Sequence, residues 1–206
     1  MQQHWNAFYA DTQIDRTGFW EPTPEASLRL VERCNLLPED LILDAGGGAS
    51  TFALRLIERG FKNLVVADIS QVALDNARER LGVSASSVQW ITADLGEPAG
   101  LASLHDVALW HDRAALHFLT EAREREAYSA TVNRAVRPGG YVVLAAFSLA
   151  GARDCSGLPI RNYDARMLGE VLGDAFREVE SFDHLYINPA GDPRPYVYAL
   201  FQRHSA

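Results

Sequence analysis

The sequence contains no long uninterrupted run of apolar residues. A helix that spans a membrane needs roughly 20 such residues, so no membrane-spanning segment is expected. Residues 1–5 also lack the basic and apolar regions of a signal peptide, and both absences favour a cytoplasmic protein. No tract of low complexity interrupts the 206 residues, of which 48% are hydrophobic. The chain can therefore bury one substantial core, and a single domain is the simplest organisation.

Cysteine and positive charge are both scarce. Cys34 and Cys155 are the two cysteines, and they have no metal-ligand spacing, so neither a disulfide framework nor a metal site is expected. Lys and Arg total 19 against 27 Asp and Glu, which gives a formal net charge of -8. Such a chain repels phosphate backbones and anionic membranes, so nucleic acid is a poor candidate for a partner. No exposed apolar stripe indicates an oligomeric state.

An acid followed by glycines forms the most informative stretch of the chain. Residues 41–43 are apolar and predict a buried strand that ends at the carboxylate of Asp44. Gly46, Gly47 and Gly48 then permit positive φ angles and a close approach of the backbone to a ligand. Apolar residues at helical spacing follow. The stretch therefore predicts a strand, a glycine turn and a helix, an arrangement that suits a nucleotide-like ligand.

Two further strands are predicted to end at acidic residues. The run 64–68 closes on Asp68, and the run 88–94 closes on Asp94. Parallel strands share one carboxyl edge, so these two acids and Asp44 are expected at the edge where open α/β sheets bind ligands. The alternation of strands and helices predicts an α/β fold with helices on both faces of a parallel sheet.

These acids and glycines resemble the successive motifs of class I S-adenosylmethionine-dependent methyltransferases. The resemblance rests on residues 44–48, Asp68 and Asp94 and covers most of the chain. It implies a Rossmann-like, doubly wound sheet of seven strands, mostly parallel with an antiparallel C-terminal strand and with helices on both faces. Residues 196–202 would form that C-terminal strand, and residues 22–206 would form a single methyltransferase domain.

The resemblance also implies which residues bind the cofactor. In the family, the glycine loop cradles the methionine and ribose portions, the acid after the second strand binds the ribose hydroxyls, and the acid after the third faces the adenine amino group. Ser50 stands where the family pattern has its third glycine, and a nicotinamide-binding fingerprint fits this loop less well. The residues expected to bind S-adenosylmethionine are Asp44, Gly46, Gly47, Gly48, Asp68, Ile69, Asp94, Leu95 and Trp20.

Residues 1–21 are too aromatic for a disordered tail, yet they show no sustained helical or strand period. In related methyltransferases an N-terminal segment often forms a lid over the cofactor and substrate, and we predict that role here. The faces of Tyr9 and Trp20 would then attract the cationic sulfonium group, which contributes about 0.5 to 2 kcal/mol when desolvated. The alternative is that these rings only pack the segment onto the domain, which is favoured for Trp5.

The catalytic groups are expected after a fourth strand at 106–110, in a loop that begins His111, Asp112, Arg113. This stretch is similar to the Trp-Asp-Arg segment of thiopurine-type methyltransferases, with an additional histidine. His111 could act as a general base, or it could be a neutral histidine bonded to backbone. Asp112 and Arg113 could pair with each other or cap the next helix, and Arg113 could instead clamp an anionic substrate.

The predicted function is methyl transfer from S-adenosylmethionine to a small-molecule acceptor by in-line displacement, with no metal required. A small metabolite such as an acid or a thiol is favoured over a protein side chain. The long connection 148–163 leaves the carboxyl edge of the sheet, so its Arg153, Arg161 and Tyr163 are candidates for substrate contact. A protein lysine methyltransferase on the same fold remains an alternative. So do aminopropyl transfer, nicotinamide-dependent reduction and a non-catalytic module that binds S-adenosylmethionine.

Overall fold

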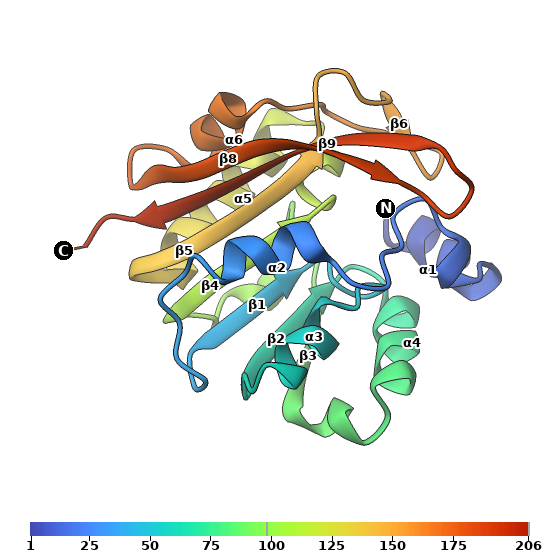
Figure 1. The fold of residues 1–206 in the computed structure, drawn as a ribbon, viewed down its shortest axis with the longest axis horizontal. Helices are drawn as coiled ribbons and strands as arrows, with labels where there is room; N and C mark the ends of the chain where they lie inside the picture. Colours follow the sequence, from blue (N-terminus) through green and yellow to red (C-terminus); the bar gives the residue numbers. More distant parts are fainter. Residues whose placement is uncertain (98, 206) are drawn as a thin grey trace.

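A computed structural model describes residues 1–97 and 99–205. A seven-stranded sheet runs through the whole molecule in the order β3-β2-β1-β4-β5-β9-β8 (Figure 1). Its strands are β1 (Leu41–Ala45), β2 (Asn63–Asp68), β3 (Val88–Thr92), β4 (Val107–Arg113), β5 (Val136–Phe147), β8 (Phe176–Ile187) and β9 (Pro193–Arg203).

Strands β1 to β5 pair in parallel, whereas β9 is antiparallel to both β5 and β8. The reversal follows from a hairpin, because β8 and β9 are joined by the short turn at 188–192. The predicted doubly wound sheet with an antiparallel C-terminal strand is therefore confirmed. Its carboxyl edge brings the ends of β1, β2 and β4 together.

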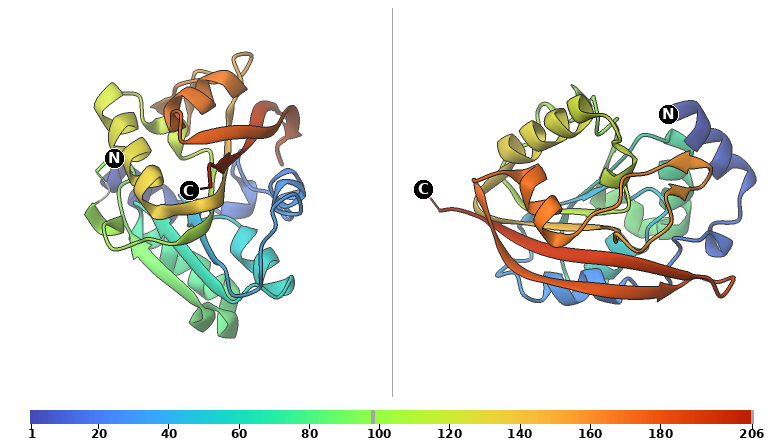
Figure 2. Two further views of the ribbon diagram at one scale, coloured as in Figure 1. Left: turned by 90° about the vertical axis from the view of Figure 1, so that its left-hand side faces the viewer. Right: turned by 90° about the horizontal axis from the view of Figure 1, so that it is seen from above.

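Helices cover both faces of this sheet (Figure 2). Helices α2 (Glu25–Val31), α3 (Phe52–Glu58) and α4 (Gln71–Leu81) bury apolar side chains on one face, and α5 (Ala122–Ala135) and α6 (Ala165–Leu172) do so on the other. As predicted, the side chains of Ser70 and Asp164 cap α4 and α6. The 3₁₀ turns are η1 (Ile14–Arg16), η2 (Gly82–Ser87), η3 (Ala99–Leu101) and η4 (Leu116–Phe118).

The N-terminal segment is more regular than its sequence indicated, since α1 (Gln2–Asp11) is helical. Trp5 and Tyr9, four residues apart, lie on its buried side. The helix contacts α4 through a hydrogen bond from Ser70 Oγ to Asn6 Oδ1 (2.8 Å) and one from Asn76 Nδ2 to the carbonyl of Tyr9 (3.2 Å). The lack of a sustained helical period in the sequence thus did not reveal this helix.

Several strands differ in length from the prediction. β4 continues through Arg113, so the expected catalytic residues lie in the strand and not in a following loop. β5 begins at Val136 and includes a turn with Gly139 at φ 75° and a register shift opposite β4. β3 ends at Thr92, so Asp94 lies two residues beyond it.

The long connection after β5 contains a small hairpin of β6 (Asp154–Cys155) and β7 (Leu158–Pro159). Its turn places Ser156 and Gly157 at positive φ. Among the described helices, none has both the length and the apolar character needed to cross a membrane.

Candidate active site

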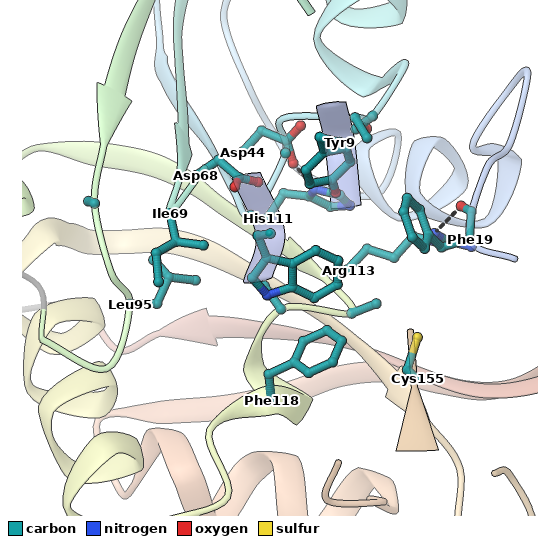
Figure 3. Close-up of a pocket in the computed structure, with 18 of the residues that line it drawn as sticks. Tyr9, Phe19, Asp44, Asp68, Ile69, Leu95, His111, Arg113, Phe118 and Cys155 are labelled. Atoms are coloured by element: carbon teal, nitrogen blue, oxygen red, sulfur yellow. Dashed lines mark hydrogen bonds and ion pairs between the residues drawn. The ribbon is translucent and has the colours of Figure 1, made fainter. Parts of the chain in front are cut away.

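A cavity lies at the carboxyl edge of the sheet, between the glycine turn and the N-terminal segment (Figure 3). Both Gly48 and Asp112 lie outside its wall. The other predicted site residues all line it, namely Trp20, Asp44, Gly46, Gly47, Asp68, Ile69, Asp94, Leu95, His111 and Arg113.

The turn after β1 depends on glycine. Gly46 has φ 72°, and a Cβ there would overlap the Cβ of Ala115, while a Cβ at Gly47 would overlap Oδ2 of Asp44. The N–H groups of both glycines donate to the carbonyl of Ala67 (2.7 and 3.2 Å). The turn is thus folded tightly against β2, and Asp44 lies beneath it.

Asp68 ends β2 as a buried carboxylate held by backbone. The N–H of Gly48 donates to Oδ2 (3.1 Å) and the N–H of Ser70 donates to Oδ1 (2.8 Å). A Cβ at Gly48 would lie 2.7 Å from the Cβ of Ala73. The absence of a side chain at Gly48 therefore lets its N–H approach Asp68, although Gly48 does not line the cavity. Burial raises the pKa of Asp68 to about 6, although these hydrogen bonds lower it.

His111 is buried between two polar side chains on β1 and α2. Its Nδ1 lies 2.7 Å from Oδ1 of Asp44, its Nε2 lies 2.8 Å from Oγ of Ser27, and its ring stacks on Phe52. A carboxylate only accepts, so Nδ1 donates to Asp44. Both ring nitrogens therefore have partners, whereas the buried Oδ2 of Asp44 has none among the described residues.

Asp112 points into the core on the opposite face of the sheet. Its carboxylate accepts hydrogen bonds from the N–H groups of Ala115 and Leu116 and from the hydroxyl of Tyr128, which in turn accepts from Nε1 of Trp110. Burial raises the pKa of Asp112 to about 6, although these hydrogen bonds lower it. Asp112 thus secures the turn after β4.

Arg113 lies in the cavity wall, and two of its three nitrogens donate hydrogen bonds. Its Nε donates to the hydroxyl of Tyr198 (2.9 Å), its Nη1 donates to the carbonyl of Phe19 (2.9 Å), and its guanidinium lies 4.8 Å from the ring centre of Tyr196. Burial lowers the pKa of Arg113, but Tyr196, Tyr198 and Glu21 outweigh burial and raise it above its ordinary value. The guanidinium is therefore a fixed positive charge.

Glu21 is a charged residue of the cavity wall that the sequence did not indicate. It is 8% exposed, and its Oε1 lies 3.2 Å from Nη2 of Arg113. No local motif marks this residue. Its position beside Trp20, at the end of the aromatic segment, was the available signal.

An apolar slot with an acid at its edge lies beside Asp68. Ile69 follows β2, Leu95 follows β3, and both contribute apolar side chains to the wall. Asp94 accepts a hydrogen bond from the N–H of Gly96 (2.8 Å) through Oδ1. This combination suits a flat heterocycle that carries a hydrogen-bond donor.

Aromatic rings from the N-terminal segment close the other side of the cavity. Trp5, Tyr9 and Phe19 line it together with Phe118, and the rings of Trp5 and Phe118 meet edge to face at 5.0 Å. Trp20 also lines it, but the guanidinium of Arg80 lies 5.6 Å from its ring centre. Trp5, expected to serve packing alone, thus faces the cavity as well.

The long connection after β5 contributes one residue to the cavity wall, Cys155. Figure 3 shows it with Phe118 on the side opposite Asp44 and Asp68. Arg153 and Arg161, expected as substrate contacts, are exposed and do not line the cavity. Within the described ranges, no group of three or more His, Cys, Asp or Glu side chains is arranged to hold a metal ion.

The fold and the cavity define a doubly wound α/β protein with a ligand site at the end of β1, β2 and β4. Residues 42–140 match the model of a protein family described as a methyltransferase domain. No curated protein matches the chain.

Several solved structures share this fold. An S-adenosylmethionine-dependent methyltransferase from Anabaena variabilis has a TM-score of 0.78 at 14% identity, over 98% of this chain and 93% of that chain. The 1,6-didemethyltoxoflavin-N1-methyltransferase of Burkholderia thailandensis, with bound 1,6-didemethyltoxoflavin and S-adenosylhomocysteine, has a TM-score of 0.73 at 18% identity, over 99% and 87%. The N-methyltransferase NodS of Bradyrhizobium japonicum has a TM-score of 0.67 at 18% identity, over 90% and 100%.

Residues 42–140 thus match a methyltransferase domain, and the chain as a whole has the fold of solved S-adenosylmethionine-dependent methyltransferases.

Proposed function

We propose that this chain is a class I S-adenosylmethionine-dependent methyltransferase, and that it methylates a small molecule held in the cavity between the glycine turn and the N-terminal segment. The observation that carries the proposal is the pair of buried carboxylates, Asp44 and Asp68, beside a turn that only glycine can form. A cavity bounded by rings of residues 1–21 suits a small acceptor better than a side chain of a folded protein. One structural neighbour is named for a small-molecule acceptor, which agrees with this choice.

The residues of the cavity fit the cofactor. Asp68 would accept hydrogen bonds from the ribose hydroxyls, Ile69 and Leu95 would enclose the adenine, and Asp94 would accept from its amino group. Oδ2 of Asp44, buried without a hydrogen-bond partner in the described structure, would accept from the ammonium group of the methionine portion. When bound, the cofactor supplies an electrophilic methyl group to the acceptor.

His111 is proposed to act through Asp44. Both of its ring nitrogens are bonded, so it has no free nitrogen with which to take a proton from an acceptor. Its hydrogen bond instead fixes one oxygen of Asp44 and directs the other towards the cavity. We therefore assign His111 a positioning role, Asp112 a structural role, and Arg113 a role in contacting the acceptor.

The N-terminal segment is proposed to be a lid. Residues 1–21 contribute several aromatic side chains to the cavity wall, and α1 rests on α4 through the hydrogen bonds of Asn6 and Tyr9. Closure of such a segment would exclude water from the transferred methyl group. Tyr9 lies beside Asp68 and would present its ring to the sulfonium cation.

Calorimetric titration tests the cofactor assignments. S-Adenosylmethionine and S-adenosylhomocysteine should bind, and NADH should not. Asp68→Asn should weaken S-adenosylhomocysteine binding by roughly 1.5 to 3 kcal/mol, because charged hydrogen bonds are lost. Asp15→Asn, which changes an exposed acid outside the cavity, is the matched control. Equal affinity of the wild type and Asp68→Asn would remove Asp68 from the site.

A further inference from the structure

An ion pair lies in the cavity wall, between Glu21 at the end of the N-terminal segment and Arg113 at the end of β4. Their charges are joined at 3.2 Å, and both side chains are about nine-tenths buried. The pair is neutral as a whole, so Arg113 does not present an uncompensated positive charge to an acceptor. This arrangement argues against the acidic acceptor that Arg113 alone would favour.

Each member of the pair has one polar atom without a hydrogen bond, although Nη2 of Arg113 also faces Oε1 of Glu21 in the ion pair. The Nε and Nη1 atoms of Arg113 already donate to Tyr198 and Phe19. Nη2 of Arg113 and Oε2 of Glu21 make no hydrogen bond within the described part of the chain, and both atoms are buried. A buried donor and a buried acceptor without partners are costly unless a ligand satisfies them.

The other charged side chains of the cavity wall are acidic. Asp44, Asp68 and Asp94 line the cavity along with Glu21, and Arg113 is the one arginine or lysine in the same wall among the described residues. A second anion placed here would meet like charges at low dielectric, which weakens its binding. The wall therefore selects against carboxylate and phosphate acceptors.

The shape of the wall favours a flat molecule. Trp5, Tyr9, Phe19 and Phe118 present aromatic surfaces to the cavity. Phe19 also supplies the carbonyl that fixes Arg113, so this aromatic surface and the ion pair belong to one wall. A planar ring with a polar edge would contact both at once.

We propose that Glu21 and Arg113 form a recognition pair for an uncharged, planar acceptor that carries an N–H and a carbonyl side by side, as in a cyclic amide. Nη2 of Arg113 donates to the carbonyl, and Oε2 of Glu21 accepts from the N–H. The inference rests on the proposed function, because it assumes that the acceptor occupies this cavity. Glu21 thereby becomes a specificity-determining residue.

Binding of two matched probes to the protein saturated with S-adenosylhomocysteine tests this inference. Carbostyril is an uncharged bicyclic amide, and quinaldate is a bicyclic carboxylate of similar size. Wild type should bind carbostyril more tightly than quinaldate by about tenfold or more, because the anion meets like charges. Glu21→Gln removes the negative charge and should reduce this preference by about tenfold, whereas Asp174→Asn, an exposed acid after α6 and outside the cavity, should leave it unchanged.

Tighter or equal binding of quinaldate by the wild type would overturn the inference. So would failure of the S-adenosylhomocysteine complex to bind carbostyril, or an unchanged preference in a Glu21→Gln protein that binds S-adenosylhomocysteine normally. If the Glu21→Gln protein folds poorly, the comparison of carbostyril with quinaldate binding in the wild type decides the inference by itself. Failure of S-adenosylhomocysteine itself to bind is recorded separately and would refute the proposed cofactor site.

Discussion

Acidification should weaken cofactor binding through one carboxyl group, that of Asp68. Burial raises the pKa of Asp68 to about 6, and the neighbouring Asp44 adds to this effect. The ribose hydroxyls donate hydrogen bonds, so the ionised carboxylate is the form that binds them. Protons therefore compete with the cofactor below the pKa of this group.

The size of the effect follows from the pKa. Asp68 is about nine-tenths ionised at about pH 7 and about one-tenth ionised at about pH 5. If binding requires the carboxylate, the affinity for S-adenosylhomocysteine falls about tenfold between these pH values, or about 1.4 kcal/mol. Affinity should be nearly constant above about pH 7.

Calorimetry of S-adenosylhomocysteine binding across this pH range measures the effect. Asp68→Asn has no titrating carboxyl, so its affinity should be weaker and independent of pH over the range. Asp112→Asn removes a carboxyl of similar pKa outside the cavity and should keep the wild-type dependence. A pH dependence that survives in Asp68→Asn, or a flat profile in the wild type, would refute the reasoning.

Three other substitutions are predicted to have distinct effects. Gly47→Ala places a Cβ against Asp44 and should lower the affinity for S-adenosylhomocysteine about tenfold or more, and an unchanged calorimetric affinity would contradict the tight turn. His111→Ala leaves Asp44 and Ser27 without their partner, so the free energy of unfolding in urea should fall by roughly 2 to 4 kcal/mol and cofactor affinity should fall with it. A loss of turnover with unchanged stability and affinity would indicate instead that His111 acts as a general base. The carboxyl of Asp112 has a pKa of about 6 in the folded state against 3.8 as its ordinary value, so the folded state holds its proton more tightly and stability declines as pH rises between these values. Asp112→Asn should flatten that part of the plot of Tm against pH, and an unchanged slope would show that Asp112 titrates normally.

The sheet and its ligand-binding edge were predictable because their signals are local. Apolar runs that end at Asp44 and Asp68 specify strands, and glycines that follow an acid specify the turn. The acid after a parallel strand must lie at the carboxyl edge, whatever the rest of the fold does. For the same reason the order of strands and helices was enough to indicate helices on both faces.

The parts that were missed depend on partners distant in the sequence. His111, Asp112 and Arg113 are polar, which predicts a loop, but they continue β4 because each is bonded inside the fold, to Asp44, Tyr128 and Tyr198 respectively. Glu21 pairs with Arg113 across 92 positions of chain, and no local pattern encodes this contact.

The N-terminal helix was missed for a different reason. The segment that forms α1 buries Trp5 and Tyr9 but otherwise has mixed polarity, so its apolar period is weak. Its aromatic side chains pack against Phe118 and its backbone is tied to α4, and these tertiary contacts stabilise it. Local propensity alone does not carry this information.

A crystal structure of the complex with S-adenosylhomocysteine tests the central claim most directly. The account predicts that the ribose hydroxyls contact Asp68, that the adenine lies between Ile69 and Leu95, and that the amino group of the homocysteine portion contacts Oδ2 of Asp44. The space beside Glu21 and Arg113 should remain open for the acceptor. Density for the ligand outside this cavity, or an adenine lying against the Glu21–Arg113 pair, would contradict the account.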